Sequence, residues 1–221
     1  SGAGVVIGDA INECKALAEK LDAPVCNGYQ HNDSFPGSHP LAVGPLGYNG
    51  SKAAMQLISK ADVVLALGTR LNPFSTLPGY GIDYWPKNAN IIQVDMNPDR
   101  IGLTKKVTVG IAGDAKQVAK QIFDKLSSNA GDSGREDRKN LIHQTKSAWL
   151  QTLTSLDHED DDPGTVWNKE ARERDKDRMS PRQAWRAIQA AMPEDAIISS
   201  DIGNNCAIGN AYPTFEKPRK Y

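Results

Sequence analysis

Residues 61–70 read Ala-Asp-Val-Val-Leu-Ala-Leu-Gly-Thr-Arg, and this stretch decides the fold. The five residues from Val63 to Leu67 are all apolar, and Gly68-Thr69-Arg70 follows them directly. Short unbroken apolar runs are typical of strands in a parallel sheet, because helices cover both faces of such a sheet. The stretch therefore predicts a buried strand of an α/β domain.

Similar runs recur on both sides of this strand, with helical segments between them. Further strands are predicted at 24–26, 90–95 and 107–111. Helices are predicted from an N-cap at Asp9 to Leu21, over 51–60, and from Gly113-Asp114 through Leu126. Alternation of strands and helices predicts a doubly wound parallel sheet.

The first domain is assigned to 1–128, and its least regular part is the range 27–49. This range contains many glycines and prolines, so we predict a long loop without helix. Loops of this length inside a domain are often functional.

Charged residues dominate 129–179, which we predict to be one helix over 135–156 followed by a solvated connector. At Ser180 the pattern changes, because Ser180, Pro181 and Gln183 form a capping box with proline at the first helical position. The range 180–221 is therefore predicted to begin a second α/β domain.

In this second domain the capping box opens a helix that ends at Met192. A strand is predicted at 196–200, followed by a polar, glycine-bearing loop over 201–205. Ligands of open α/β sheets bind outside the carboxyl ends of the strands, which is where this loop falls.

Elements at both ends of the chain look interrupted. Ser1-Gly2-Ala3-Gly4 is typical of a turn after a strand, and the chain ends soon after the loop at 201–205. We interpret the chain as an internal piece of a larger enzyme, cut within one domain at the front and another at the back. Proteolytic processing is the alternative.

Composition excludes several classes of protein. A net charge of −1 and a pI near 6.4 give no electrostatic footprint for nucleic acid or an anionic membrane. No run approaches the roughly 18 apolar residues of a membrane span. Cys14, Cys26 and Cys206 are scattered thiols without a CxxC pair, which indicates buried, reduced cysteines and a cytoplasmic protein.

Glycines and charged residues follow three of the predicted strands. The candidate nucleotide-binding residues are Gly68, Arg70, Asp95, Gly113 and Asp114. Glycines allow phosphates to approach the backbone, an arginine pairs with them, and an acidic residue can accept ribose hydroxyls, so with Gly2-Ala3-Gly4 this set suits a dinucleotide or ADP. The alternative is that these residues only close turns and cap helices, and form a vestigial, empty site.

The sequence identifies neither a catalytic residue nor a metal site. His31 and His39 lack further ligands at zinc spacing. The acidic cluster at 157–162 lacks the spacing and glycine of a calcium loop. A serine nucleophile elbow and a Walker loop are also missing from the sequence.

The segment from Ile92 to Gly102, Ile-Gln-Val-Asp-Met-Asn-Pro-Asp-Arg-Ile-Gly, resembles the middle-domain signature of thiamine-diphosphate enzymes of the acetohydroxyacid synthase and pyruvate oxidase type. Leu67-Gly68-Thr69-Arg70 and Gly113-Asp114 lie in matching order. This resemblance implies a pyrimidine-binding domain, a middle domain and a diphosphate-binding domain, with thiamine diphosphate and Mg²⁺ as cofactors. The activating glutamate and the Gly-Asp-Gly to Asn magnesium motif of that family have no match here.

The same resemblance implies thiamine diphosphate contacts at Asp201, Gly203, Asn204 and Asn205, which match the loop that approaches the cofactor in the family. The alternative that these residues only shape a turn stays open.

Longer segments resemble one acyltransferase branch of the family; they are 30–33, 46–52, 72–81, 158–164 and 201–206. The resemblance implies conversion of sulfoacetaldehyde and phosphate to acetyl phosphate and sulfite through acetyl-thiamine diphosphate, as in sulfonate metabolism and taurine degradation. It also implies a homo-oligomer. Two alternatives remain: another thiamine-diphosphate carboligase or decarboxylase acting on a 2-oxo acid, and a nucleotide-binding module without catalysis.

Overall fold

The structure is a computed structural model that describes residues 1–131, 133–157, 178–179, 181–201, 203–210 and 212–221. Its helices are α1 (Ala3–Ile7), α2 (Ile11–Leu21), α3 (Lys52–Ile58), α4 (Pro73–Thr76), α5 (Ala115–Lys125), α6 (Arg135–Asp157), α8 (Pro181–Ala191) and α9 (Asn204–Gly209), with a 3-10 turn η1 (Pro98–Arg100). Its strands are β1 (Val25–Asn27), β2 (Ala42–Pro45), β3 (Val63–Leu67), β4 (Asn90–Asp95) and β5 (Val109–Ala112).

The strands are parallel, which confirms the predicted α/β class. Hydrogen bonds divide the described strands into two sheets, one of order β1-β2 and one of order β3-β4-β5. In the second sheet the register runs from Val63 opposite Asn90 to Leu67 opposite Val94. The strand β2 lies inside the range predicted to be a loop, so that part of the prediction is wrong. Residues 42–45 are extended because they pair with β1.

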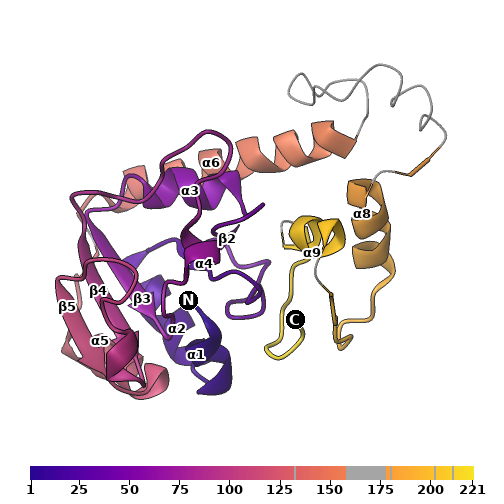
Figure 1. Ribbon diagram of the computed structural model, residues 1–221. Coiled ribbons are helices and arrows are strands. Elements are labelled where there is room, and N and C mark those ends of the chain that lie inside the picture. Colours follow the sequence, from indigo (N-terminus) through magenta and orange to yellow (C-terminus); the bar gives the residue numbers. More distant parts are fainter. Residues whose placement is uncertain (132, 158–177, 180, 202, 211) are drawn as a thin grey trace.

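Helices lie on both faces of the sheets (Figure 1). Helix α2 contacts α5 on one face, and α3 contacts α6 on the other. The core between these layers includes Val5, Ala54, Met55 and Val94, each fully buried. Helices therefore cover both faces, as a doubly wound fold requires.

Asp9 is not the N-cap of the first long helix, contrary to the sequence prediction. Its φ of 51° places it in the left-handed region, and Ala10 is the N-cap of α2. The Asp9 carboxylate instead accepts a hydrogen bond from Lys116 Nζ at 3.2 Å. The helix itself is confirmed, and its Cys14, Leu17 and Ala18 are buried as expected.

Burial of the strands is less complete than the apolar runs predict. Val63, at the start of β3, is 52% exposed, and Val109, at the start of β5, is 46% exposed. Strand β5 is an edge of its sheet. Only the carboxyl half of β3 is fully buried, with Ala66 and Leu67 each 3% exposed.

The predicted strand at 196–200 is wrong. These residues form no strand in the structure; Ile197 is 75% exposed, and Ile198 N donates one backbone hydrogen bond to Lys220 O at 2.8 Å. A strand needs a neighbour along its length, and the described residues contain none for this segment. The loop predicted over 201–205 is also shorter, because Asn204 and Asn205 begin α9.

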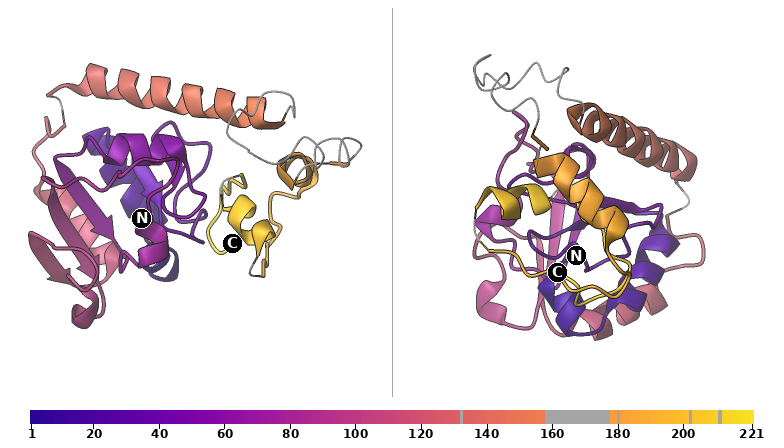
Figure 2. Two further views of the ribbon diagram at one scale, coloured as in Figure 1. Left: turned by 45° about the horizontal axis from the view of Figure 1, so that its top comes forward. Right: turned by 90° about the vertical axis from the view of Figure 1, so that its right-hand side faces the viewer.

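Helices α8 and α9 lie together beside the first part of the chain (Figure 2). Gly209 allows this contact, since a Cβ there would lie 2.7 Å from Trp185 Cζ2. Residues 158–177 of the predicted connector and Ser180, the predicted N-cap, lie outside the described residues. No described helix is long and apolar enough to span a membrane.

Candidate functional site

The candidate nucleotide-binding residues lie at the carboxyl ends of the strands of the sheet β3-β4-β5. The backbone brings the start of the chain to these strand ends: Gly2 N donates to Leu67 O at 3.2 Å, and Gly4 N donates to Gly68 O at 2.8 Å. Gly113 N donates to Asp95 O at 3.0 Å. The structure thus brings together the glycines and acidic residues that the sequence proposes as a set.

Gly4 and Gly68 are in direct backbone contact. A Cβ at Gly4 would lie 2.7 Å from Gly68 Cα, and a Cβ at Gly68 would lie 2.8 Å from Gly4 Cα. Gly68 also has a φ of +60°, which favours glycine. Both glycines are therefore needed for the approach of α1 to β3, with or without a ligand at these strand ends.

The acidic residues at these strand ends make local hydrogen bonds. Asp114 is the N-cap of α5, and its Oδ1 accepts from Gln117 N at 3.0 Å. Asp95 Oδ1 accepts from Asn97 N at 2.9 Å and fixes the turn after β4. The side chain of Arg70 is exposed, and its carbonyl accepts from Thr104 Oγ1 at 3.1 Å. These hydrogen bonds agree with the alternative in which the residues only close turns and cap helices.

The second candidate site begins at Asp201, which is exposed. Gly203 is the N-cap of α9 and has a φ of +141°, a conformation that side-chain-bearing residues rarely adopt. A Cβ at Gly203 would meet no atom of the described residues within 4 Å. Its backbone is thus open to a ligand, and Asn204 and Asn205 form the first turn of the helix that follows.

A contact that sequence analysis missed holds this helix against residues 28–48. It joins a polar loop, residues 28–39, to a tail segment, residues 206–221. Asn32 Nδ2 donates to Asn210 O at 3.0 Å and to Pro213 O at 3.2 Å. Asn210 is fully buried, and its Nδ2 donates to Tyr48 O at 3.2 Å.

Further hydrogen bonds extend this contact toward the chain end. Lys220 N donates to Asp33 Oδ2 at 3.0 Å. Ser38 donates to both carboxylate oxygens of Glu216, from its N at 2.9 Å and from its Oγ at 2.8 Å. The loop composition was the only signal in the sequence, because the partners are nearly 180 residues away.

The two histidines of the polar loop have different surroundings. Burial lowers the pKa of His31. His39 Nε2 lies 3.1 Å from Glu19 Oε1, and its Nδ1 accepts from Leu41 N. Among the described residues, no group of three or more potential ligands could hold a metal ion.

The Cys14 and Cys26 thiols are not poised for nucleophilic chemistry. Burial raises the pKa of Cys26 to about 11 and also raises that of Cys14, so both stay protonated near neutral pH. Cys206 Sγ lies 3.5 Å from the hydroxyl of Tyr29. Burial raises the pKa of that hydroxyl above its usual value, and burial and the nearby Cys206 raise the pKa of Tyr221 to about 12.

Comparison with known proteins places this geometry in context. Residues 1–122 match the family described as thiamine pyrophosphate enzyme, central domain. Over all 221 residues the chain is 79% identical to a probable sulfoacetaldehyde acetyltransferase of Rhizobium meliloti, and 74% identical to a sulfoacetaldehyde acetyltransferase of Roseovarius nubinhibens. It is 30% identical, along its whole length, to an acetolactate synthase large subunit of Buchnera aphidicola. The chain spans 37%, 37% and 35% of the lengths of these relatives.

Proposed function

We propose, from the premise that this chain belongs to the thiamine pyrophosphate enzyme family, that the whole protein is an acyltransferase. The proposed reaction converts sulfoacetaldehyde and phosphate to acetyl phosphate and sulfite. The observation that carries the proposal is 79% identity over all 221 residues to a probable sulfoacetaldehyde acetyltransferase. Identity to an acetolactate synthase large subunit and to two probable ones is lower, at 30% and 28% over the whole chain and 37% over 156 residues.

We further propose that Asp201, Gly203, Asn204 and Asn205 lie against the diphosphate of thiamine diphosphate. The open backbone at Gly203 supports this assignment, because a ligand can approach it closely. When bound, the cofactor would supply a carbanion that attacks the carbonyl carbon, and Mg²⁺ would balance the diphosphate charge. The chain's own contribution is orientation: the bonds of Asn32 and Asn210 hold α9 against the first domain.

For Gly68, Arg70, Asp95, Gly113 and Asp114 we propose the vestigial alternative, in which the site holds no nucleotide. The amides of Gly2 and Gly4 already donate to protein carbonyls, so they are not available to a phosphate. Calorimetric titration of the whole protein with ADP and with FAD tests this proposal. Saturable binding that Arg70→Ala abolishes would contradict it.

We also propose that the whole protein is a cytoplasmic homo-oligomer. The family resemblance supports the homo-oligomeric state. The free cysteines support a cytoplasmic location, because thiols stay reduced there. Light scattering on the purified whole protein tests the first point; a monomer at micromolar concentration would contradict it. Fractionation of the source cells tests the second.

Sulfite release tests the activity. The whole protein, expressed from its complete reading frame, is incubated with sulfoacetaldehyde, phosphate, thiamine diphosphate and Mg²⁺. We expect sulfite and acetyl phosphate in equal amounts, and no acetyl phosphate when phosphate is omitted. Turnover of pyruvate with no turnover of sulfoacetaldehyde would favour the 2-oxo acid alternative instead.

Cofactor affinity tests the site. In the whole protein, we expect Asn204→Ala or Asn205→Ala to weaken thiamine diphosphate more than sulfoacetaldehyde. One lost hydrogen bond to a charged group is worth roughly 1.5–3 kcal/mol, or about a tenfold to 150-fold loss of affinity. Gly203→Val should cost more, since a β-branched residue resists a φ of +141°.

The measurement is half-saturation of the apo-enzyme by the cofactor, with the exposed residue Asn88 changed to alanine as the control. Wild-type half-saturation in both asparagine variants would show that this loop only shapes a turn, and would leave the proposed reaction standing.

A further inference from the structure

Two adjacent residues of the polar loop, Tyr29 and Gln30, both contact the sulfur of Cys206 in α9. The Tyr29 hydroxyl lies 3.5 Å from Cys206 Sγ, and Gln30 Nε2 donates to the same sulfur at 3.6 Å. The backbone of Gln30 joins this contact, because its N donates to Asn210 Oδ1 at 3.4 Å. Cys206 is buried and Asn210 is the C-cap of α9, so the two residues hold this short helix at two points along its length.

The backbone of Gln30 has an unfavourable conformation at this contact. Its φ of +63° lies in the left-handed region, which residues with a side chain seldom adopt. Gln30 is exposed, so packing in the core does not account for the conformation. Such strain persists only where surrounding contacts fix it, and it is concentrated at functional sites. The contacts that fix it here are the hydrogen bonds to Asn210 and Cys206.

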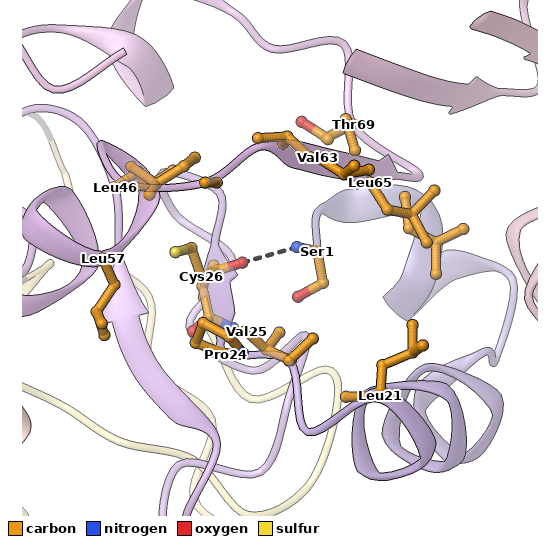
Figure 3. Close-up of a pocket in the computed structure, with 18 of the residues that line it drawn as sticks. Ser1, Leu21, Pro24, Val25, Cys26, Leu46, Leu57, Val63, Leu65 and Thr69 are labelled. Carbon is orange, nitrogen blue, oxygen red and sulfur yellow. Dashed lines mark hydrogen bonds between the residues drawn. The ribbon is translucent and has the colours of Figure 1, made fainter. Parts of the chain in front are cut away.

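The other side of this pair of residues is held by β1 and α4. In Figure 3 a hydrogen bond joins Ser1 N to Cys26 O of β1, and its length is 2.7 Å. Gly28 N donates to Ser1 O at 2.7 Å, so the backbone is held as far as the residue before Tyr29. Tyr29 N then donates to Ser75 Oγ of α4 at 3.0 Å. Tyr29 and Gln30 therefore join α9 to a part of the structure whose own position is fixed.

We propose that Tyr29 and Gln30 are positioning residues for thiamine diphosphate, which act through Cys206 on the start of α9. The inference rests on the proposed function, which places Gly203 and the first turn of α9 against the cofactor diphosphate. Glycine allows many backbone conformations, so the bonds at Cys206 limit the positions that Gly203 can take. Neither Tyr29 nor Gln30 touches the cofactor in this arrangement.

The alternative is that these bonds only stabilise the fold, and Gln30→Gly separates the two roles. Glycine adopts a φ of +63° without strain and keeps the N–H that bonds to Asn210, but it lacks the amide that bonds to Cys206. We expect the urea midpoint of unfolding to stay the same or rise. The dissociation constant for thiamine diphosphate should nevertheless rise by about threefold to tenfold, the value of one ordinary hydrogen bond.

Changes at the other two side chains test the same contact. Tyr29→Phe removes only the hydroxyl, and Cys206→Ala removes the acceptor, so both should raise the dissociation constant by a similar factor. Cys206→Ser keeps an acceptor and should retain most of the wild-type affinity. Combining Gln30→Gly with Cys206→Ala should raise the constant no further than Cys206→Ala alone, because the two changes remove the same bond.

Calorimetric titration of the whole apo-protein with thiamine diphosphate, in the presence of Mg²⁺, measures the dissociation constants. Asn49→Gly is the matched control, because Asn49 also has a left-handed backbone, with a φ of +50°, and is exposed. We expect this control to bind the cofactor with wild-type affinity.

Wild-type dissociation constants in Gln30→Gly and Tyr29→Phe would overturn the proposal. An equal rise in Gln30→Gly and Asn49→Gly would overturn it as well, since added backbone freedom would then explain the loss. If Asn204→Ala or Asn205→Ala still weakens the cofactor in either case, the proposed site stands and only the positioning role fails. Wild-type affinity in those two variants would remove the proposed site and the positioning role together.

Discussion

Two features of the structure disfavour a side chain at Gly68. The φ of +60° disfavours any side chain, and the space where a Cβ would lie is filled by the backbone of Gly4. Gly134 shares only the first feature, since its φ is +63° and a Cβ there would meet no atom within 4 Å. The two positions separate the conformational cost of a side chain from the cost of a backbone clash.

We predict that Gly68→Ala lowers the free energy of unfolding by about 3 kcal/mol or more, and Gly134→Ala by about 1–2 kcal/mol. The left-handed backbone accounts for the smaller value, and displacement of α1 from β3 accounts for the difference. Urea unfolding of both variants measures the two losses of unfolding free energy. Equal losses would show that α1 shifts without cost.

His31 gives the stability a pH dependence. Burial lowers its pKa below the usual value of 6.5, so in this range the unfolded chain binds more protons than the folded chain. The free energy of unfolding therefore falls as the pH drops below 6.5. We predict that His31→Gln flattens this dependence between pH 6.5 and about 5.

Thermal unfolding across that range measures the effect, with His143→Gln on the exposed side of α6 as the control. The assignment fails if His31→Gln keeps the wild-type slope; His143→Gln is expected to keep it.

At the scale of elements, the contact of the polar loop with the tail segment depends on buried amides. Asn32 is 5% exposed, and its Nδ2 bonds two carbonyls of the tail segment. We predict that Asn32→Ala lowers the free energy of detaching the tail segment by about 1–3 kcal/mol, because buried carbonyls lose their donors.

Hydrogen exchange at the Asn210 amide, which bonds Cys206 O at 2.9 Å, measures this detachment. Asn88→Ala, at an exposed position, should leave the exchange rate unchanged. An unchanged rate in Asn32→Ala would show that other bonds carry the contact.

Elements with local signals were predictable from the sequence, and elements that depend on a distant partner were not. Ser51 caps α3 through a bond from Ala54 N, and the apolar run of β3 needs no other segment to be recognised. By contrast, β2 is a strand only because β1 lies beside it, and 196–200 fails to become one for lack of a neighbour.

The candidate sites follow the same division. The sequence placed Gly68 and Asp95 at strand ends, and the structure brings those ends together. It left open whether Asp95 and Asp114 bind a ligand or only close turns and cap helices, and in the structure their carboxylates accept bonds in a local turn and a helix cap. The sequence did not reveal Asn32 and Asn210, whose roles depend on residues far along the chain.

At the scale of the whole molecule, Asp201, Gly203, Asn204 and Asn205 are the residues that the family resemblance assigns to thiamine diphosphate. The activating glutamate and the Gly-Asp-Gly motif of the family have no match in the 221 residues. We predict that the purified 221-residue chain releases no sulfite above background from sulfoacetaldehyde, phosphate, thiamine diphosphate and Mg²⁺. Robust turnover by this chain alone would contradict the assignment of catalysis to residues outside it.

The large sequence separation of Asn32 and Asn210 also matters while the chain is being synthesised. The two residues are 178 positions apart, so a ribosome adding about 5–20 residues per second makes the second one roughly ten to forty seconds after the first. Throughout that interval Asn32 and Asp33 lack their hydrogen bonds to the tail segment. These two polar side chains can remain hydrated until the tail is made, whereas apolar side chains in their place would offer neighbouring nascent chains a surface on which to aggregate.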